Sequence, residues 1–360
     1  MKILISTIIG TFISFTFATA FVVSPSAIGG QRSGQGDIHR IAYTFVTADI
    51  PLPDSPGIIA IPEDINDHGV MIANVFNNTP SYALTVEPVK RRSTNFHPTT
   101  FNCNGVADSA AYSINIKGQI TGNCVDNPSG PSKQFGFVRY RNGTHILLDF
   151  PGADHTLAFG INDRGHVVGE YYNPLIPELS GLFRIHGFLW DGDSYTTIDF
   201  PQANTYTTLW SVNNRGKILG EYVSFDPATN ETLERKSFVY DNGNFILDFP
   251  ESLEHVGGPA IFLADMNNDG QIIGERWNGG PDWNGVFLYD DGKFYDIELP
   301  PDFASADVRG MNNKGQFVGA YLKEVGIDQI NGWPIYESHG YVATPAPQRH
   351  TLEFVSKAGR

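Results

Sequence analysis

One short phrase recurs six times along this chain and constrains its fold more than any other feature. The phrase reads apolar-Asn-x-x-Gly-x-apolar-apolar-Gly, with small variations. Its six copies begin at Ile65, Ile114, Ile161, Val212, Met266 and Met311. Their first glycines follow one another at intervals of 49, 47, 51, 54 and 45 residues. A period near fifty that is held over most of a chain is typical of a propeller or a solenoid.

Turn residues divide each repeat into four short, strand-like segments. In the third copy these are 156–162, 165–172, 186–190 and a last strand that ends at Pro201. Asn-Asp-x-Gly and Asp-Gly turns join them in pairs, and such turns favour β-hairpins because they tolerate positive φ. No long segment has helical periodicity. The pattern predicts an all-β fold, a six-bladed β-propeller of four-stranded blades.

The two ends of the repeat region predict how the ring closes. The fourth strand ends in Asp-Phe-Pro or a similar phrase at 149–151, 199–201, 248–250 and 298–300. The same phrase, 49–51, stands before the first full repeat, whereas the last repeat stops after its third strand at 339–342. We therefore expect the N-terminal strand 43–51 to complete the last blade and cover its free edge.

The first twenty residues are typical of a secretory signal peptide. Lys2 is followed by an apolar run, 3–17, and by a small-residue cleavage site at 18–20. An uncleaved anchor is the alternative, because the run approaches the length of a membrane span. The remainder divides into an N-terminal extension, 21–41, the propeller, 42–345, and a C-terminal tail, 346–360. We expect a secreted or periplasmic protein with no membrane association after cleavage.

The charge and composition of the chain limit the kinds of partner that we expect. A formal net charge of −15 argues against nucleic acid and anionic membranes, because both attract clustered Lys and Arg. No phosphate cradle or cofactor motif is present, so we expect no cofactor, and we expect a monomer. Cys103 and Cys124 lie in one repeat, and in an exported protein a disulfide between them is the default interpretation. A reactive or metal-binding pair is the alternative.

Several recurring phrases together resemble a known family. Ile161-Asn162 with its following glycines, His186-Gly187-Phe188 and Ile198-Asp199-Phe200-Pro201 are similar to the repeats of the bacterial extracellular HAF-repeat proteins. The similarity covers roughly residues 42 to 345. It implies a propeller-like fold and export, and it carries no catalytic residues to transfer.

Three glutamates occupy the same place in consecutive repeats. Glu170, Glu221 and Glu275 each follow the second glycine of the phrase, where the other copies have Asn74, Asn123 and Ala320. Carboxylates that converge on a central funnel could bind a metal or act as an acid–base pair in sugar hydrolysis. The alternative is that this position only leads the strand into solvent. We name no catalytic residue.

Asp265, Asn267 and Asp269 match the start of a calcium loop, in which alternate residues supply oxygen ligands. The same residues, however, form the hairpin turn that every repeat has. They are a weak calcium candidate beside the structural interpretation, and we predict no metal site.

Aromatic residues fall in the segments that should connect strands. They are Tyr171, Tyr172, Trp277, Trp283 and Trp333, and the tryptophans have Asn, Asp and Gly nearby. Flat rings beside amides suit carbohydrate binding, because a ring stacks on sugar C–H groups while amides bind hydroxyls. Packing over the loop backbone is the equal alternative.

Three functions fit these patterns. The first is an exported module that binds a glycan or an envelope protein through its loops. The second is a polysaccharide hydrolase or lyase that uses carboxylates from adjacent blades. The third is a structural envelope protein without a specific ligand. We favour a role without catalysis.

Overall fold

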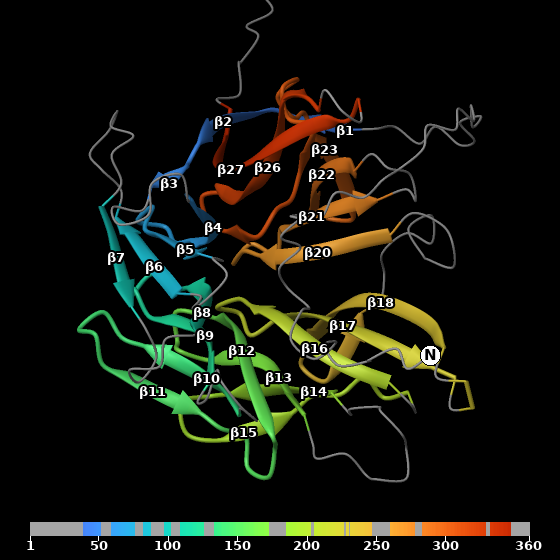
Figure 1. The fold of residues 1–360 in the computed structure, drawn as a ribbon. Coiled ribbons are helices and arrows are strands. Elements are labelled where there is room, and N and C mark those ends of the chain that lie inside the picture. The colour runs from blue at the N-terminus through green and yellow to red at the C-terminus, as the bar shows by residue number, and fades with distance from the viewer. Residues whose placement is uncertain are drawn as a thin grey trace, which may run out of the picture. The chain divides into compact units, whose positions relative to one another are not determined.

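A computed structural model shows six sheets arranged as the blades of a ring (Figure 1). The structure describes residues 39–51, 59–75, 82–87, 97–101, 109–125, 133–172, 185–202, 205–226, 228–229, 231–246, 260–277, 283–328 and 332–346. Within these ranges the regular structure is entirely β-strand. None of it forms a helix long and apolar enough to cross a membrane. The prediction of an all-β, six-bladed propeller is confirmed.

The first three blades follow one another along the chain, each built from antiparallel neighbours. From the inner to the outer strand the first blade contains β4 (Ile59–Ile65), β5 (Met71–Val75), β6 (Tyr82–Glu87) and β7 (His97–Phe101), with β3 (Ile50–Pro51) beside β4. The second contains β8 (Ser109–Ile114), β9 (Ile120–Val125), β10 (Gln134–Arg139) and β11 (His145–Leu148). The third contains β12 (His155–Ile161), β13 (Val167–Tyr172), β14 (Ile185–Trp190) and β15 (Tyr195–Thr197).

The last three blades continue the pattern and receive the N-terminal strands. The fourth contains β16 (Thr205–Val212), β17 (Ile218–Phe225), β18 (Thr232–Asp241) and β19 (Asn244–Ile246). The fifth contains β20 (Ala260–Met266), β21 (Ile272–Trp277), β22 (Trp283–Asp290), β23 (Lys293–Ile297) and, in parallel, β1 (His39–Ile41). The sixth contains β24 (Ser305–Ala306), β25 (Gly310–Met311), β26 (Phe317–Ile327), β27 (Pro334–Pro345) and β2 (Tyr43–Thr47).

Both glycines of the recurring phrase have a physical reason. The first closes the turn with a positive φ, 91° at Gly165, which L side chains rarely adopt. The second lies where two strands of one blade approach closely. A Cβ atom on Gly169 would stand 1.9 Å from the backbone oxygen of Leu157. The phrase therefore records one turn in each blade and, in the five copies that have the second glycine, one tight strand contact.

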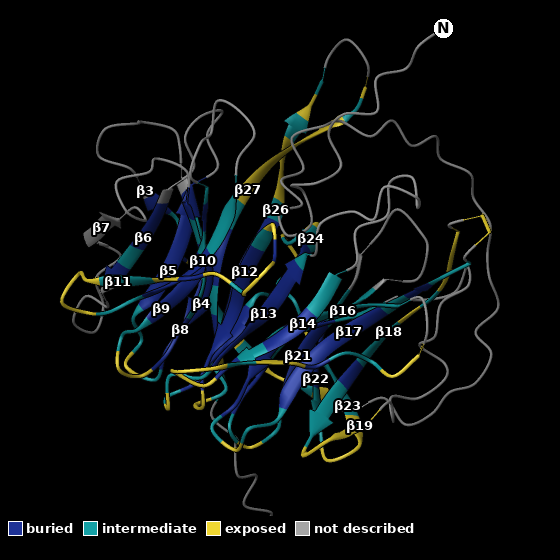
Figure 2. Ribbon diagram, turned by 90° about the horizontal axis from the view of Figure 1, so that it is seen from below, coloured by how far each residue is buried: buried dark blue, intermediate teal, exposed yellow. Residues whose placement is uncertain are grey.

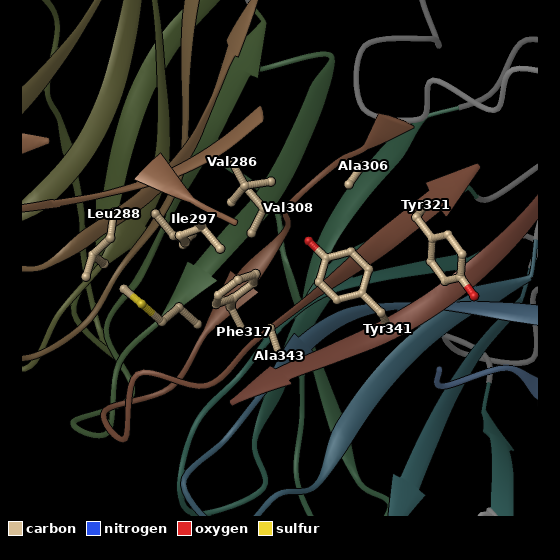
Figure 3. Close-up of a cluster of buried hydrophobic side chains, with 11 residues drawn as sticks. Val286, Leu288, Ile297, Ala306, Val308, Phe317, Tyr321, Tyr341 and Ala343 are labelled. Carbon is tan, nitrogen blue, oxygen red and sulfur yellow. The ribbon is translucent and has the colours of Figure 1, made fainter. Parts of the chain in front are cut away.

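Apolar side chains fill the space between neighbouring blades, and Figure 2 shows the strands largely in the colours of buried and half-buried residues. Rings stack across the seams: the centroids of Phe150 and Tyr171 lie 3.6 Å apart with an interplanar angle of 6°. Figure 3 shows the cluster between the fifth and sixth blades, in which Phe317 and Tyr341 are fully buried. These contacts hold the inner strands at fixed positions around the axis.

The N-terminal strand β2 pairs with β27 as the outermost strand of the sixth blade. The pairing is antiparallel and runs from Tyr43 opposite Pro345 to Thr47 opposite Tyr341. In Figure 1 the blue N-terminal strand lies beside the red C-terminal one. β1, which lies in the segment that we assigned to an extension, is paired as well, with β23. How strongly these strands stabilise the ring stays a prediction.

The asparagine of each phrase closes its own turn, and five of the six also donate to the next blade. Asn162 Oδ1 accepts hydrogen bonds from the backbone N–H groups of Arg164 and His166, both at 3.0 Å. Its Nδ2 donates to the backbone oxygen of Asn213 in the next blade at 3.1 Å. The equivalent links run from Asn66 to Asn115, from Asn115 to Asn162, from Asn213 to Asn267 and from Asn312 to Asn66.

A second circle of hydrogen bonds lies directly beside the first. The N–H of the residue after each asparagine donates to the side chain of its counterpart in the next blade, at 2.7–2.9 Å. The links are Ile116 to Asp163, Asp163 to Asn214, Asn214 to Asn268, Asn268 to Asn313, and Asn313 to Asp67. The remaining link, from Asp67 to Ile116, cannot form because isoleucine has no acceptor.

Candidate functional site

The six inner strands surround the axis of the ring, whose two faces differ. The turn face carries the six Asn-x-x-Gly turns. The loop face is opposite and carries the connections that follow β5, β9, β13, β17, β21 and β26. Much of the loop face falls outside the described residues. Glu170, Glu221 and Glu275 lie on β13, β17 and β21, toward the loop face.

Glu170 bridges the third and fourth blades. Its Oε2 accepts a hydrogen bond from the Thr208 hydroxyl at 2.6 Å, and its Oε1 accepts one from the Tyr172 hydroxyl at 2.6 Å. Glu221 accepts a hydrogen bond from Arg235 Nε at 2.7 Å within its own blade. Both carboxyls are buried, and burial raises both pKa values. The charge of Glu221 also raises the pKa of Glu170.

Glu275 belongs to a second group at the seam between the fifth and sixth blades. Its Oε1 accepts a hydrogen bond from the Val308 N–H at 2.7 Å. Asp307 and Arg309 on the adjoining inner segment form an ion pair at 3.0 Å. Arg309 also pairs with Glu63 of the first blade. Burial, and then the charge of Asp307, raise the pKa of Glu275 to about 8.

Sequence reasoning missed Glu63, Asp307 and Arg309. Burial raises the pKa of Glu63 to about 7, and the positive charge of Arg309 offsets only part of this rise. A signal was present, because Glu63 and Arg309 stand three residues before the asparagine in the first and last copies of the phrase. Once the ring closes, these two copies become neighbours, so opposite charges at one repeat position predict an ion pair.

Tyr171 and Tyr172 have different surroundings on β13. Tyr171 is buried and stacked between Phe150 and His186, with its hydroxyl 2.9 Å from that of Thr197. Tyr172 is half-buried and holds Glu170. Tyr171 therefore packs within the protein, which is the alternative to carbohydrate binding. Tyr172 lies beside Glu170 and contacts the ring of His155.

The three candidate tryptophans are placed unequally. Trp277 and Trp283 are opposite one another at the ends of β21 and β22, and their side chains lie outside the described set. Trp333 is half-buried at the tip of the β26–β27 hairpin, and its backbone oxygen accepts a hydrogen bond from the Asp328 N–H at 2.7 Å. Trp333 therefore belongs to the hairpin of the sixth blade, whereas Glu170, Glu221 and Glu275 belong to the third, fourth and fifth blades.

The β26–β27 hairpin extends past the strands that flank it. Its inner neighbour β24 ends opposite Leu322 and Tyr321, and its outer neighbour β2 ends opposite Tyr341. Figure 2 shows the projecting end as exposed. That end carries four apolar side chains with 44–53% of their surface exposed, namely Val325, Ile327, Ile335 and Tyr336.

The two carboxylates of the weak calcium candidate already have hydrogen-bond or ion-pair partners within the protein. Asp265 accepts hydrogen bonds from the Ser211 hydroxyl and from the backbone N–H of Met311, and Asp269 faces Arg215 in solvent. Asp265 and Asp64 flank a turn-face pocket of about 70 Å³, which is far smaller than typical small-molecule sites of roughly 300–1,000 Å³. Burial, and then Asp265, raise the pKa of Asp64. Among the described residues no cluster of His, Cys, Asp and Glu suits a metal ion.

Several predictions fall outside the described residues. The signal peptide, 1–20, most of the extension, 21–41, and most of the tail, 346–360, belong to this group. So does Cys103, whereas Cys124 is buried in the core between the first and second blades. The disulfide and the export signal stay predictions.

No protein-family model and no curated protein matches this chain. Solved propeller-type structures are similar at low identity. The β-propeller domain of the trilobed protease from Pyrococcus furiosus, described as having an open velcro topology, covers 78% of this chain and 81% of its own, with 11% identity and a TM-score of 0.46. Streptogramin B lyase covers 84% and 98%, with 9% identity and a TM-score of 0.41. An α-L-arabinofuranosidase from Podospora anserina, in complex with cellotriose, covers 87% and 99%, with 9% identity and a TM-score of 0.36. These similarities imply nothing about the chemistry of this chain.

Proposed function

We propose that this protein is an exported binding module that recognises a glycan through its loop face. The exposed end of the β26–β27 hairpin is the observation that carries the proposal. A two-stranded ribbon that projects into solvent with four exposed apolar side chains is the kind of surface that a ligand or partner covers. Trp333 and Tyr336 supply rings that can stack on a sugar, and Asp328 and Glu324 supply polar groups beside them.

The arrangement of the glutamates favours binding over catalysis. Glu170 and Glu275 each accept a hydrogen bond from the next blade, and Glu221 is held by an arginine. A carboxylate whose oxygens hold the scaffold together is less free to transfer protons to a substrate. Membership of the HAF-repeat family remains part of this proposal and rests on the repeated phrases alone.

The proposal can be tested by depletion from solution. The mature protein, residues 21–360, is mixed with a panel of insoluble polysaccharides, and the protein left in the supernatant is measured. Trp333→Ala and Tyr336→Ala should weaken retention on the bound polysaccharide by about tenfold or more, and Leu147→Ala on the outer strand β11 should not. Retention unchanged in both hairpin variants would remove the hairpin from the site. No depletion by any polysaccharide would overturn the proposal of a glycan ligand and leave a protein partner as the candidate.

A polysaccharide hydrolase or lyase is the second candidate, and one observation favours it. Glu63 and Glu275 have pKa values raised to about 7 and about 8, so both can carry a proton near neutral pH, as a general acid must. Release of new reducing ends from the polysaccharide, lost in Glu275→Gln, would establish catalysis. Binding without release after prolonged incubation would exclude it for that substrate.

A further inference from the structure

Three exposed basic side chains lie together on the turn face, over the second and third blades. Lys117 and Arg164 are at the tips of the Asn-x-x-Gly turns, the inner turns, of these blades. Arg141 is in the outer turn of the second blade, from β10 to β11. This turn lies at the same end of the blade, because Arg139 just before it pairs with Ile120, which follows the inner turn. We call Lys117, Arg141 and Arg164 the basic patch.

The side chain of Arg141 covers the turn that carries Lys117. A Cβ atom placed on Gly118 would stand 3.7 Å from Cδ of Arg141 and 3.8 Å from its Cβ and Cγ. The carbon chain of the arginine therefore rests on the backbone next to Lys117, and both cationic side chains belong to one surface.

The turn that carries Arg164 adjoins the same surface. A Cβ atom placed on Gly165 would stand 3.8 Å from Oε1 of Gln119 in the second blade. The N–H of Ile116 donates to Oδ1 of Asp163 at 2.9 Å. Both carboxylate oxygens of Asp163 accept hydrogen bonds from neighbouring blades, so this acid already has partners beside Arg164. The cations of the two blades therefore lie on either side of a single seam.

The second blade departs from the charge pattern of the blades that follow it. In those blades the outer turn has a carboxylate three residues after the buried phenylalanine of the third strand, namely Asp191, Asp241 and Asp290. Asp241 pairs with Lys217 beside the inner turn at 3.4 Å. The second blade has Tyr140 at this position and Arg141 after it. A base therefore replaces an acid beside the inner turn of the second blade.

Most other arginines that the structure describes are neutralised by carboxylates. Ion pairs hold Arg40, Arg215, Arg235, Arg276 and Arg309. Within the described part of the chain, by contrast, Lys117, Arg141 and Arg164 have no ion pair. In a protein with a formal net charge of −15, three unpaired cations on one surface are a local exception. Such a surface attracts an anionic ligand.

The overall charge decides which kind of anion can reach the basic patch. A bilayer or a nucleic acid duplex presents many negative charges and would also meet the acidic remainder of the protein. A single polymer chain can contact the patch alone, since exposed charges farther apart than about 8 Å are largely screened at physiological salt. The planar guanidinium groups of Arg141 and Arg164 suit carboxylates, to which they can donate two N–H groups at once.

We propose that the basic patch binds a carboxylate-bearing polysaccharide, in which Arg141 and Arg164 hold acidic groups and Lys117 adds a third positive charge. The inference goes beyond the proposed function, because it places a second contact on the face opposite the β26–β27 hairpin and gives this contact a charged ligand. No covalent step is involved. With one polysaccharide on each face, a single protein molecule would link two polymer chains.

Two polymers with the same backbone and different charge provide the test. Binding of polygalacturonate and of its methyl ester to the mature protein, residues 21–360, is measured by biolayer interferometry at about pH 7, where free carboxylates are ionised. Polygalacturonate should bind at least about tenfold more tightly than the ester. Its affinity should fall by about tenfold between about 50 and 200 mM salt, as expected for about three charge contacts.

Variants of the basic patch show where the polymer binds. Arg141→Gln and Arg164→Gln should each lower the affinity for polygalacturonate by at least about threefold, and the double variant by at least about tenfold. Arg215→Gln is the matched control, because Arg215 has the same turn position in the fourth blade but pairs with Asp269. It should change the affinity by less than about twofold, and so should Tyr336→Ala in the hairpin.

Each result has a separate meaning. Equal binding of polygalacturonate and its ester, or binding that the patch variants leave unchanged, would overturn the inference. No binding of polygalacturonate would overturn it too, and hairpin-dependent retention on a neutral polysaccharide would then leave the loop-face proposal in place. Binding to phosphatidylglycerol vesicles and not to the polymer would overturn the polysaccharide in favour of a membrane. If the double variant fails to fold, the comparison of the two polymers with the unmodified protein still decides.

Discussion

Asp49 and His339, 290 positions apart, reproduce a contact that Asp199 and His186 make within one blade. The carboxylate oxygen lies 2.8 Å from the imidazole Nδ1 in the first pair and 2.6 Å in the second. In both pairs the other carboxylate oxygen accepts a backbone N–H, from Gly340 and from Gly187. The recurring His-Gly and Asp-x-Pro phrases are thus two halves of one contact, and Asp49 plays the part of Asp199.

We predict that Asp49→Ala destabilises the protein by about 1–3 kcal/mol, because it leaves a half-buried imidazole and a backbone N–H without their partner. Asp199→Ala is the matched control for the local loss. Urea denaturation of both variants measures the free energy of unfolding. If the N-terminal strand also holds the ring closed, Asp49→Ala should be cleaved faster by protease near residue 52 than Asp199→Ala is; equal rates would argue against that role.

Deletion of residues 42–51 should lower the melting temperature sharply. It removes β2 and β3, the contact with His339, and the rings of Tyr43 and Phe45, which pack against Phe317. Differential scanning calorimetry measures the change. A melting curve like that of the full chain would show that the strand is dispensable.

Ile116→Asn should stabilise the protein by about 0.5–1.5 kcal/mol. The asparagine oxygen would accept the Asp67 N–H and complete the second circle of hydrogen bonds, in which Ile116 lacks an acceptor. Leu147→Asn controls for the general effect of replacing an exposed apolar residue with a polar one. Denaturant unfolding measures both variants, and an equal change in the two would contradict the hydrogen-bond explanation.

The free energy of unfolding should fall as pH rises from about 4.5 to about 8. The pKa of Glu275 is raised from 4.5 to about 8 in the folded protein, so in this window the folded state binds a proton that the unfolded state has lost. The stabilisation is complete below 4.5 and is lost as pH passes through 8. Glu275→Gln should flatten the slope above neutral pH, whereas Glu298→Gln should leave it unchanged.

Oxidised protein should contain a disulfide between Cys103 and Cys124. In the chain-entropy model a loop of about twenty residues contributes roughly 3 kcal/mol, so reduction should lower the stability by that order. Mass spectrometry of peptides made without reduction identifies the bond. Two free thiols in protein prepared under oxidising conditions would contradict it.

The blades were predictable because each turn and each close strand contact leaves an asparagine or a glycine at a fixed position. Strand ends were less so: we expected the fourth strand of the third repeat to end at Pro201, but β15 ends at Thr197 because Asp199 turns to His186. The contact between the first and last repeats was the least predictable part. Glu63 and Arg309, which occupy the same repeat position in the first and sixth blades, meet only once the ring has formed.

The links in the two circles of hydrogen bonds point the same way, from one blade to the blade that follows it. A repeat with an acceptor side chain after its asparagine therefore carries both donor and acceptor, and a copied repeat of about fifty residues would arrive with the means to join both neighbours. Growth or loss of a blade then requires no new contact chemistry. The angle at which blades pack, and not the chemistry of the joint, sets how many fit around the axis.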